Sequence, residues 1–145
     1  MPDYGKGKIY TIRCRTDDTL IYVGSTIQQL SVRWGKHKVD SRRELHKNSL
    51  IYKTINDEWW NWYIELYELC PCNCKEELER KEGEIIRKIG TLNAQIQGRT
   101  QKEYYNDNKD KLLENKKEYY EINKEKKKEY QKAYYEKSKI KNIDI

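Results

Sequence analysis

The residues that can build a hydrophobic core are concentrated in the first two thirds of this 145-residue chain. All four tryptophans precede residue 99, and residues 99–145 contain few aliphatic side chains. Residues 1–98 carry 16 Lys/Arg and 14 Asp/Glu, whereas residues 99–145 carry 14 and 10. Only the first part can bury enough apolar surface to fold as a domain. We therefore expect a domain over residues 1–98 and a charged Lys/Glu/Tyr-rich tail over residues 99–145, either helical or disordered.

The formal net charge of +6 favours a negatively charged partner, such as nucleic acid or an anionic surface. No apolar run near the start resembles a signal peptide, and no stretch is apolar enough to span a bilayer. These observations predict a protein that acts inside the cell (cytoplasm or nucleus), is not secreted and has no membrane partner. In a reducing compartment the cysteines are thiols or ligands rather than disulfides. The one-residue gaps among Cys70, Cys72 and Cys74 favour free thiols over a zinc site.

Hydrophobic periodicity in residues 1–98 predicts three strands and three helices. The strands are expected at residues 8–15, 19–23 and 58–69, with Trp60, Trp62, Ile64 and Leu66 on one face of the third. The helices are expected after a capping box formed by Thr26 and Gln29, at residues 50–55, and at about 75–89, where Gly90 ends the last one. This order predicts an α+β fold, a small three-stranded antiparallel sheet flanked by helices.

Five side chains form a candidate catalytic group. Glu82 shares a helical stripe with Leu78 and Ile85, and a carboxylate on an apolar face must be paired, hydrogen-bonded or bound to a metal. Arg33 and His37 are four residues apart on one helix face, and the first two strands carry Tyr10 and Tyr22. Such groups suit phosphodiester hydrolysis. From the residues alone, a Glu82–Arg pair, a solvated Arg33/His37 face and core tyrosines stay open as alternatives.

Five short elements in order resemble the GIY-YIG nuclease family. They are Lys8-Ile9-Tyr10, Tyr22-Val23-Gly24-Ser25, Arg33-Trp34-Gly35-Lys36-His37, Glu82 and Leu92-Asn93. The resemblance covers about residues 7–98 and departs from the family at Lys8, where glycine is usual. The second and third of these elements resemble those of the phage intron-encoded homing endonucleases of that family. The tail is similar to extensions of GIY-YIG proteins of large DNA viruses and mobile elements, which suggests a viral or mobile-element setting.

The resemblance implies a metal-dependent endonuclease that hydrolyses DNA phosphodiester bonds. Glu82 would bind one divalent ion, Mg²⁺ or Mn²⁺, and Arg33 would contact the scissile phosphate. Tyr10 and Tyr22 would position or deprotonate the attacking water, with the choice of base left open. His37 would orient other catalytic side chains or shuttle a proton. Asn93 would hold the catalytic residues in place without contacting the substrate itself.

A basic stretch over residues 33–53 is the candidate contact with the DNA backbone. Its proposed DNA-binding residues are Lys36, Lys38, Arg42, Arg43, His46 and Lys47. In the tail, tyrosine pairs recur every fifteen residues, at 104–105, 119–120 and 134–135, close to four helical turns apart. The tail is interpreted as a solvated charged extension, as a nucleic-acid arm or as a surface for a protein partner.

Two other functions are compatible with the same sequence. One is a catalytically silent DNA-binding module that keeps the fold, which the joint presence of the five candidate catalytic residues disfavours. The other is a structure-specific repair or resolvase nuclease subunit that works with a partner protein. A panel of duplex, flap and junction substrates distinguishes the latter from a duplex nuclease.

Overall fold

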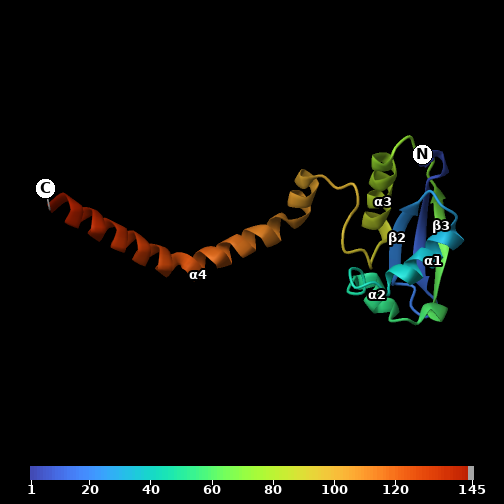
Figure 1. Ribbon diagram of the computed structural model, residues 1–145, viewed down its shortest axis with the longest axis horizontal. Coiled ribbons are helices and arrows are strands. Elements are labelled where there is room, and N and C mark those ends of the chain that lie inside the picture. Colours follow the sequence, from blue (N-terminus) through green and yellow to red (C-terminus); the bar gives the residue numbers. More distant parts are fainter. Residues whose placement is uncertain (144–145) are drawn as a thin grey trace. The chain divides into compact units, whose positions relative to one another are not determined.

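A computed structural model describes residues 1–143 and divides the chain into two compact units, Met1–Arg99 and a second unit that begins at Thr100. The first unit is built on an antiparallel sheet of strands β1 (Lys8–Cys14), β2 (Ile21–Thr26) and β3 (Trp62–Leu69) (Figure 1). The strand order is β2-β1-β3, so β1 lies in the centre and β2 forms one edge.

Strand β1 is buried on both faces because helices pack on each side of the sheet. Tyr10 and Ile12 point into one core cluster, which includes Ile51 and Ile55 of helix α2 (Leu50–Ile55) and is contacted by helix α1 (Leu30–Asp40). Ile9, on the opposite face, packs in a second cluster with residues of helix α3 (Lys75–Ile89). This alternation along β1 follows from the two-residue repeat of a strand, and the predicted α+β architecture is confirmed.

Two local predictions were wrong. Thr26 is the last residue of β2, and helix α1 begins at Leu30 after Gln29, whose side chain makes no capping hydrogen bond. The Thr26 hydroxyl instead accepts a hydrogen bond from the Gln28 backbone nitrogen at 3.1 Å. The third strand begins at Trp62, because residues Trp59–Asn61 form a 3-10 turn, and Trp60 is 75% exposed rather than on the buried face of the strand.

The edge of β2 is covered by the segment that follows α3. The backbone nitrogens of Thr91 and Leu92 donate to the Ile21 carbonyl at 2.8 and 3.0 Å. The Thr91 hydroxyl accepts from the Ile21 nitrogen at 2.8 Å. Side-chain and backbone groups therefore take the place of a fourth strand along β2 and hold the segment 91–93 beside it.

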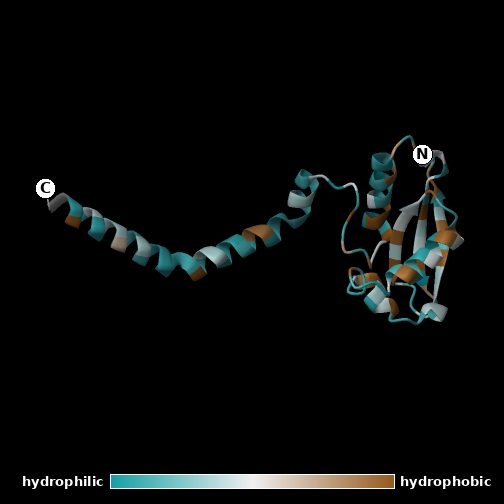
Figure 2. Ribbon diagram, viewed as in Figure 1, coloured by the Kyte–Doolittle hydropathy of each residue, from teal (hydrophilic) through white to brown (hydrophobic). Residues whose placement is uncertain are grey.

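The second unit is one long helix, α4 (Gln101–Ile143). Its side chains are predominantly hydrophilic, with isolated apolar positions (Figure 2), and the paired tyrosines at 104–105, 119–120 and 134–135 are exposed. The helical form of the tail is thus the one realised over residues 101–143. Within residues 1–143, every helix is too short or too polar to cross a bilayer.

Candidate active site

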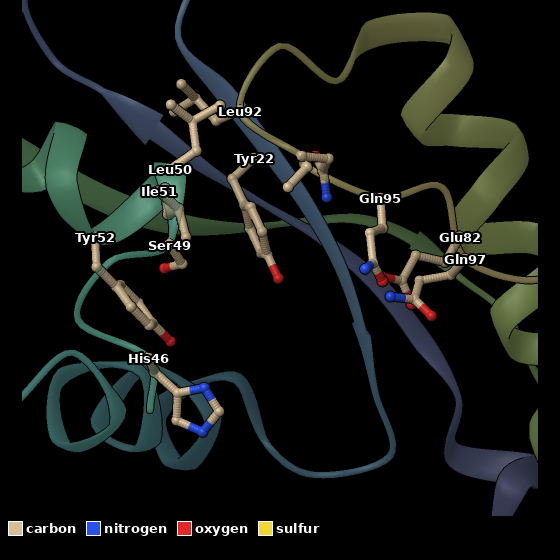
Figure 3. Close-up of a pocket in the computed structure, with 12 residues that line it drawn as sticks. Tyr22, His46, Ser49, Leu50, Ile51, Tyr52, Glu82, Leu92, Gln95 and Gln97 are labelled. Atoms are coloured by element: carbon tan, nitrogen blue, oxygen red, sulfur yellow. The ribbon is translucent and has the colours of Figure 1, made fainter. Parts of the chain in front are cut away.

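A hollow of about 630 Å³ opens in the first unit and brings together residues from four separate segments of the chain. Tyr22 comes from β2 and Glu82 from α3, while His46 and Tyr52 come from the segment that leads into and through α2. Gln95 and Gln97 come from the segment after α3. Figure 3 shows the Tyr22 side chain pointing into this space, with Glu82 on one side and Tyr52 and His46 on the other. We call this space the catalytic hollow.

Glu82 lies on the buried face of α3, as its spacing predicted. It is 7% exposed, and its neighbours on that face, Leu78, Ile85 and Ile86, are buried apolar residues. The hydroxyl of Ser25 on β2 donates a hydrogen bond to the Glu82 carboxylate. Burial raises the pKa of Glu82 to about 7, and the hydrogen bond from Ser25 opposes this rise. Near pH 7 the carboxylate therefore exchanges between its charged and its neutral form, and a neighbouring cation would stabilise the charged form.

Four side chains form a hydrogen-bonded chain, and one of them, Tyr52, lines the catalytic hollow. The Tyr10 hydroxyl lies 2.8 Å from His37 Nε2 and accepts a hydrogen bond from Arg33 Nε at 3.0 Å. The other ring nitrogen, His37 Nδ1, lies 2.9 Å from the Tyr52 hydroxyl. His37 is 1% exposed, and burial, helped by the charge of Arg33, lowers its pKa to about 3. It is thus a neutral imidazole that bridges two phenols, donating to one and accepting from the other.

The two tyrosines of the motifs occupy different environments. Tyr10 is fully buried, and burial raises the pKa of its phenol well above the usual value. Tyr22 is half-buried and lines the catalytic hollow, and burial raises the pKa of its phenol to about 12, with Glu82 adding to the rise and Arg33 lowering it. Only Tyr22 of the two lines the hollow, among the described residues.

The position of Gly24 explains why the motif Tyr22-Val23-Gly24 ends in a glycine. It lies directly opposite Tyr10 in the β1–β2 register, and a Cβ atom at position 24 would overlap the Tyr10 hydroxyl and ring. The missing side chain therefore makes the space in which the Tyr10 phenol reaches His37 and Arg33.

Asn93 holds β2 next to the hollow. Its Oδ1 accepts from the Val23 backbone nitrogen at 3.0 Å, and its Nδ2 donates to the Val23 carbonyl at 2.8 Å. The side chain thus reproduces the pairing of a neighbouring strand immediately after Tyr22, so it fixes the backbone from which Tyr22 extends.

The predicted DNA-contact residues fall into two groups. His46 lines the catalytic hollow, and Lys36 lines a second hollow together with Arg33. Lys38, Arg42, Arg43 and Lys47 line neither of these two spaces. Lys38 lies over the Trp34 ring at 5.3 Å from its centroid, while Arg43 pairs with Asp40 at 3.6 Å and Lys47 with Glu44 at 2.8 Å.

A sequence model of the GIY-YIG catalytic domain matches residues 6–97. The chain belongs to the GIY-YIG family. It is therefore an endonuclease, as the motifs in its strands indicated. Among solved structures, the catalytic domain of the homing endonuclease I-TevI matches with 24% identity and a TM-score of 0.48, over 64% of this chain and 95% of that one. A comparison with curated proteins found no match.

Glu82 is the one carboxylate among the described residues that line the catalytic hollow. Within residues 1–143, no three His, Cys, Asp or Glu side chains gather as a metal cage. Glu82 on the wall of an open hollow nevertheless fits Mg²⁺, because this ion commonly takes one or two carboxylates and completes its coordination with water and substrate phosphate. The buried carboxylate, with a raised pKa, is the kind of ligand that a divalent cation stabilises.

The structure adds residues to this GIY-YIG site that the sequence did not single out. Tyr52 completes the chain through His37, and the Ser25 hydroxyl contacts Glu82. Ser25 immediately follows the second motif, and that position was the available signal. Tyr52 gave none, because its contact joins two helices and no spacing along the chain indicates it.

Proposed function

We propose that this GIY-YIG domain, residues 1–98, hydrolyses DNA phosphodiester bonds with the help of one divalent ion, Mg²⁺ or Mn²⁺, bound at Glu82. The observation that supports this most is the buried Glu82 carboxylate facing the Tyr22 phenol across an open hollow. When bound there, the cation supplies positive charge that polarises the phosphate and favours ionisation of nearby groups.

Arg33 is the proposed contact to the scissile phosphate. Its Nε donates to the Tyr10 hydroxyl, and within the described chain no other side chain or carbonyl hydrogen-bonds its two terminal nitrogens. These donors are thus available to a phosphate oxygen, and a guanidinium fixed in advance stabilises the charge that develops in the transition state.

Tyr22 is the proposed base, and Tyr10 is a positioning residue. Tyr22 lines the hollow into which water and DNA would enter. The Tyr10 hydroxyl is instead hydrogen-bonded to Arg33 and His37. A phenol with a pKa of about 12 ionises at neutral pH only beside positive charge, and Arg33 already lowers this value. Tyr22 first releases its own proton to solvent, and the resulting phenolate then accepts a proton from the attacking water.

His37 is proposed to orient the site rather than to shuttle protons. Its two ring nitrogens are both engaged by phenols, those of Tyr10 and Tyr52, and its pKa of about 3 keeps the imidazole neutral at physiological pH. It thereby fixes Tyr10, and through Tyr10 it fixes Arg33. Asn93 supports Tyr22 through the backbone of Val23.

The DNA backbone is proposed to approach over the basic residues of α1 and the segment after it. Lys36 and His46 lie at the two hollows, and Lys38, Arg42, Arg43 and Lys47 extend the contact away from them. Exposed ion pairs such as Lys47–Glu44 stabilise the fold little, so these cations can turn to phosphate at small cost. The tail from residue 99 onward is a charged extension to this domain.

The test is a nicking assay on supercoiled plasmid, with Mg²⁺, with Mn²⁺ and after chelation, for the wild type, Tyr22→Phe and Tyr10→Phe. We expect cleavage that needs the ion, loss of at least a hundredfold in Tyr22→Phe, and a smaller loss in Tyr10→Phe. Cleavage that persists in chelator would contradict the metal requirement. Equal activity of Tyr22→Phe and wild type would contradict the base assignment. Faster cutting of flaps or junctions than of duplex would favour a structure-specific nuclease.

A further inference from the structure

A second hollow of about 340 Å³ adjoins the catalytic hollow and has the opposite charge. Counting the described residues, its lining includes three cationic side chains, Arg33, Lys36 and Lys75, and one carboxylate, Glu79. The catalytic hollow has Glu82 as its carboxylate and no lysine or arginine among the described residues that line it. We call the second space the cationic hollow.

One hydrogen bond links the linings of the two hollows. Ser25 lines the cationic hollow, and its hydroxyl donates to Glu82, which lines the catalytic hollow. Arg33, the proposed contact to the scissile phosphate, also lines the cationic hollow. A DNA strand carries one phosphate for about every 3.4 Å of duplex rise. A strand whose scissile phosphate lies at Arg33 and Glu82 therefore has a neighbouring phosphate within reach of the cationic hollow.

Both lysines of this hollow can accept a phosphate at low cost. Lys75 is the first residue of α3, and its ammonium lies 3.5 Å from Glu79 Oε1 in an (i, i+4) pair in which the lysine side chain is 66% exposed and the carboxylate side chain 32% exposed. Such pairs stabilise a fold by well under about 1 kcal/mol, so Lys75 can exchange its partner. Lys36, on α1, is exposed and forms no ion pair with any residue in the described part of the chain.

We propose that the cationic hollow binds the DNA backbone phosphate next to the scissile one, with Lys36 and Lys75 as its ligands. The inference rests on the proposed function and extends it, since it assigns Lys75 of α3 as a positioning residue beside the basic residues of α1. Because α3 also carries Glu82, a phosphate held by Lys75 sets the register of the strand relative to the catalytic carboxylate.

The test couples a protein charge to a single phosphate. The wild type first cuts a defined duplex, and the cut position is mapped. Duplexes are then made with one neutral methylphosphonate at either phosphate that flanks the cut, or at a distant phosphate as control. Dissociation constants are measured in chelator at low salt for wild type, Lys36→Ala, Lys75→Ala and Lys88→Ala, an exposed lysine in the last turn of the same helix.

We expect Lys36→Ala, Lys75→Ala and the methylphosphonate at one flanking phosphate each to weaken binding by about two- to fivefold, the range for exposed charge pairs. Either lysine variant should bind the duplex with that methylphosphonate no more weakly than the wild type binds the same duplex. When a lysine variant binds the duplex with the distant methylphosphonate, the fold-changes in dissociation constant should multiply. The same should hold when Lys88→Ala binds any of the modified duplexes.

Independent effects of Lys75→Ala at both flanking phosphates would overturn the inference while leaving the nuclease function intact. Misfolding of Lys75→Ala would also remove the coupling, so the melting temperature of this variant is compared with that of Lys88→Ala, and Lys36→Ala tests the same phosphate independently. A wild type that cuts no DNA would overturn the proposed function together with this inference.

Discussion

Tyr10 and Gly24 lie opposite each other on neighbouring strands, and the Tyr10 phenol fills the space that a side chain at position 24 would need. The motif on β2 thus leaves the space that the Tyr10 hydroxyl of the β1 motif occupies. That hydroxyl holds Arg33 and His37 in turn, so a backbone feature of β2 determines the position of a guanidinium on α1.

Gly24→Ala should therefore disturb the catalytic residues without touching DNA. The added methyl group must push the Tyr10 ring aside, and overpacking of this kind costs about 1–3 kcal/mol of unfolding free energy. We expect a lower melting temperature and at least a tenfold slower cleavage. Tyr10→Phe in the same chain should restore part of the stability, because it removes the nearest overlapping atom. The prediction is wrong if Gly24→Ala is as stable and as active as the wild type.

The sequence was informative where function leaves a local pattern. Glu82 interrupts an apolar stripe at helical spacing, and the two tyrosine motifs flank a turn between strands, so the carboxylate and the strands were predictable. Thr26 and Trp60 were misplaced because a capping pattern and an alternating pattern each ran across the end of a strand. Tyr52 and Lys75 were missed because their contacts depend on how separate helices pack, and spacing along one helix carries no information about that.

The buried His37 predicts a pH dependence of stability. Its pKa is about 3 in the folded protein and near 6.5 in an unfolded chain. Between these values the unfolded state binds a proton that the folded state excludes. The contribution of neutral His37 is therefore fully present above about pH 6.5 and is lost as the pH falls towards 3, at up to about 1.4 kcal/mol per pH unit.

The measurement compares unfolding free energies of wild type and His37→Gln at pH 7 and pH 5. The wild type should lose about 2 kcal/mol more than the variant over this range. Glu82 titrates in the opposite direction, since its raised pKa makes the folded state gain protons, but it is present in both proteins and cancels in the difference. Parallel pH curves for the two proteins would show that His37 is not held neutral.

Deleting residues 103–145 tests the role of the tail. Every proposed catalytic residue precedes residue 99, so the truncated chain should stay folded and cut DNA. The deletion removes twelve lysines. Log affinity falls as log salt rises, and each lost phosphate contact should make this fall shallower by about 0.9. The interleaved acidic residues oppose this effect. Identical salt dependence with and without the tail would exclude a DNA arm and favour a spacer or a protein-binding surface.

The central claim is that the Glu82 carboxylate is required for chemistry, and its most direct test is single-turnover cleavage in Mg²⁺ by Glu82→Gln. The matched control is Glu84→Gln, which removes an exposed carboxylate of the same helix that pairs with Lys81. Gln keeps the size of Glu82 and can still accept the Ser25 hydrogen bond, so folding and DNA binding should persist. The account predicts wild-type cleavage by Glu84→Gln and none above background by Glu82→Gln. Substantial Mg²⁺-dependent cleavage by Glu82→Gln would contradict it.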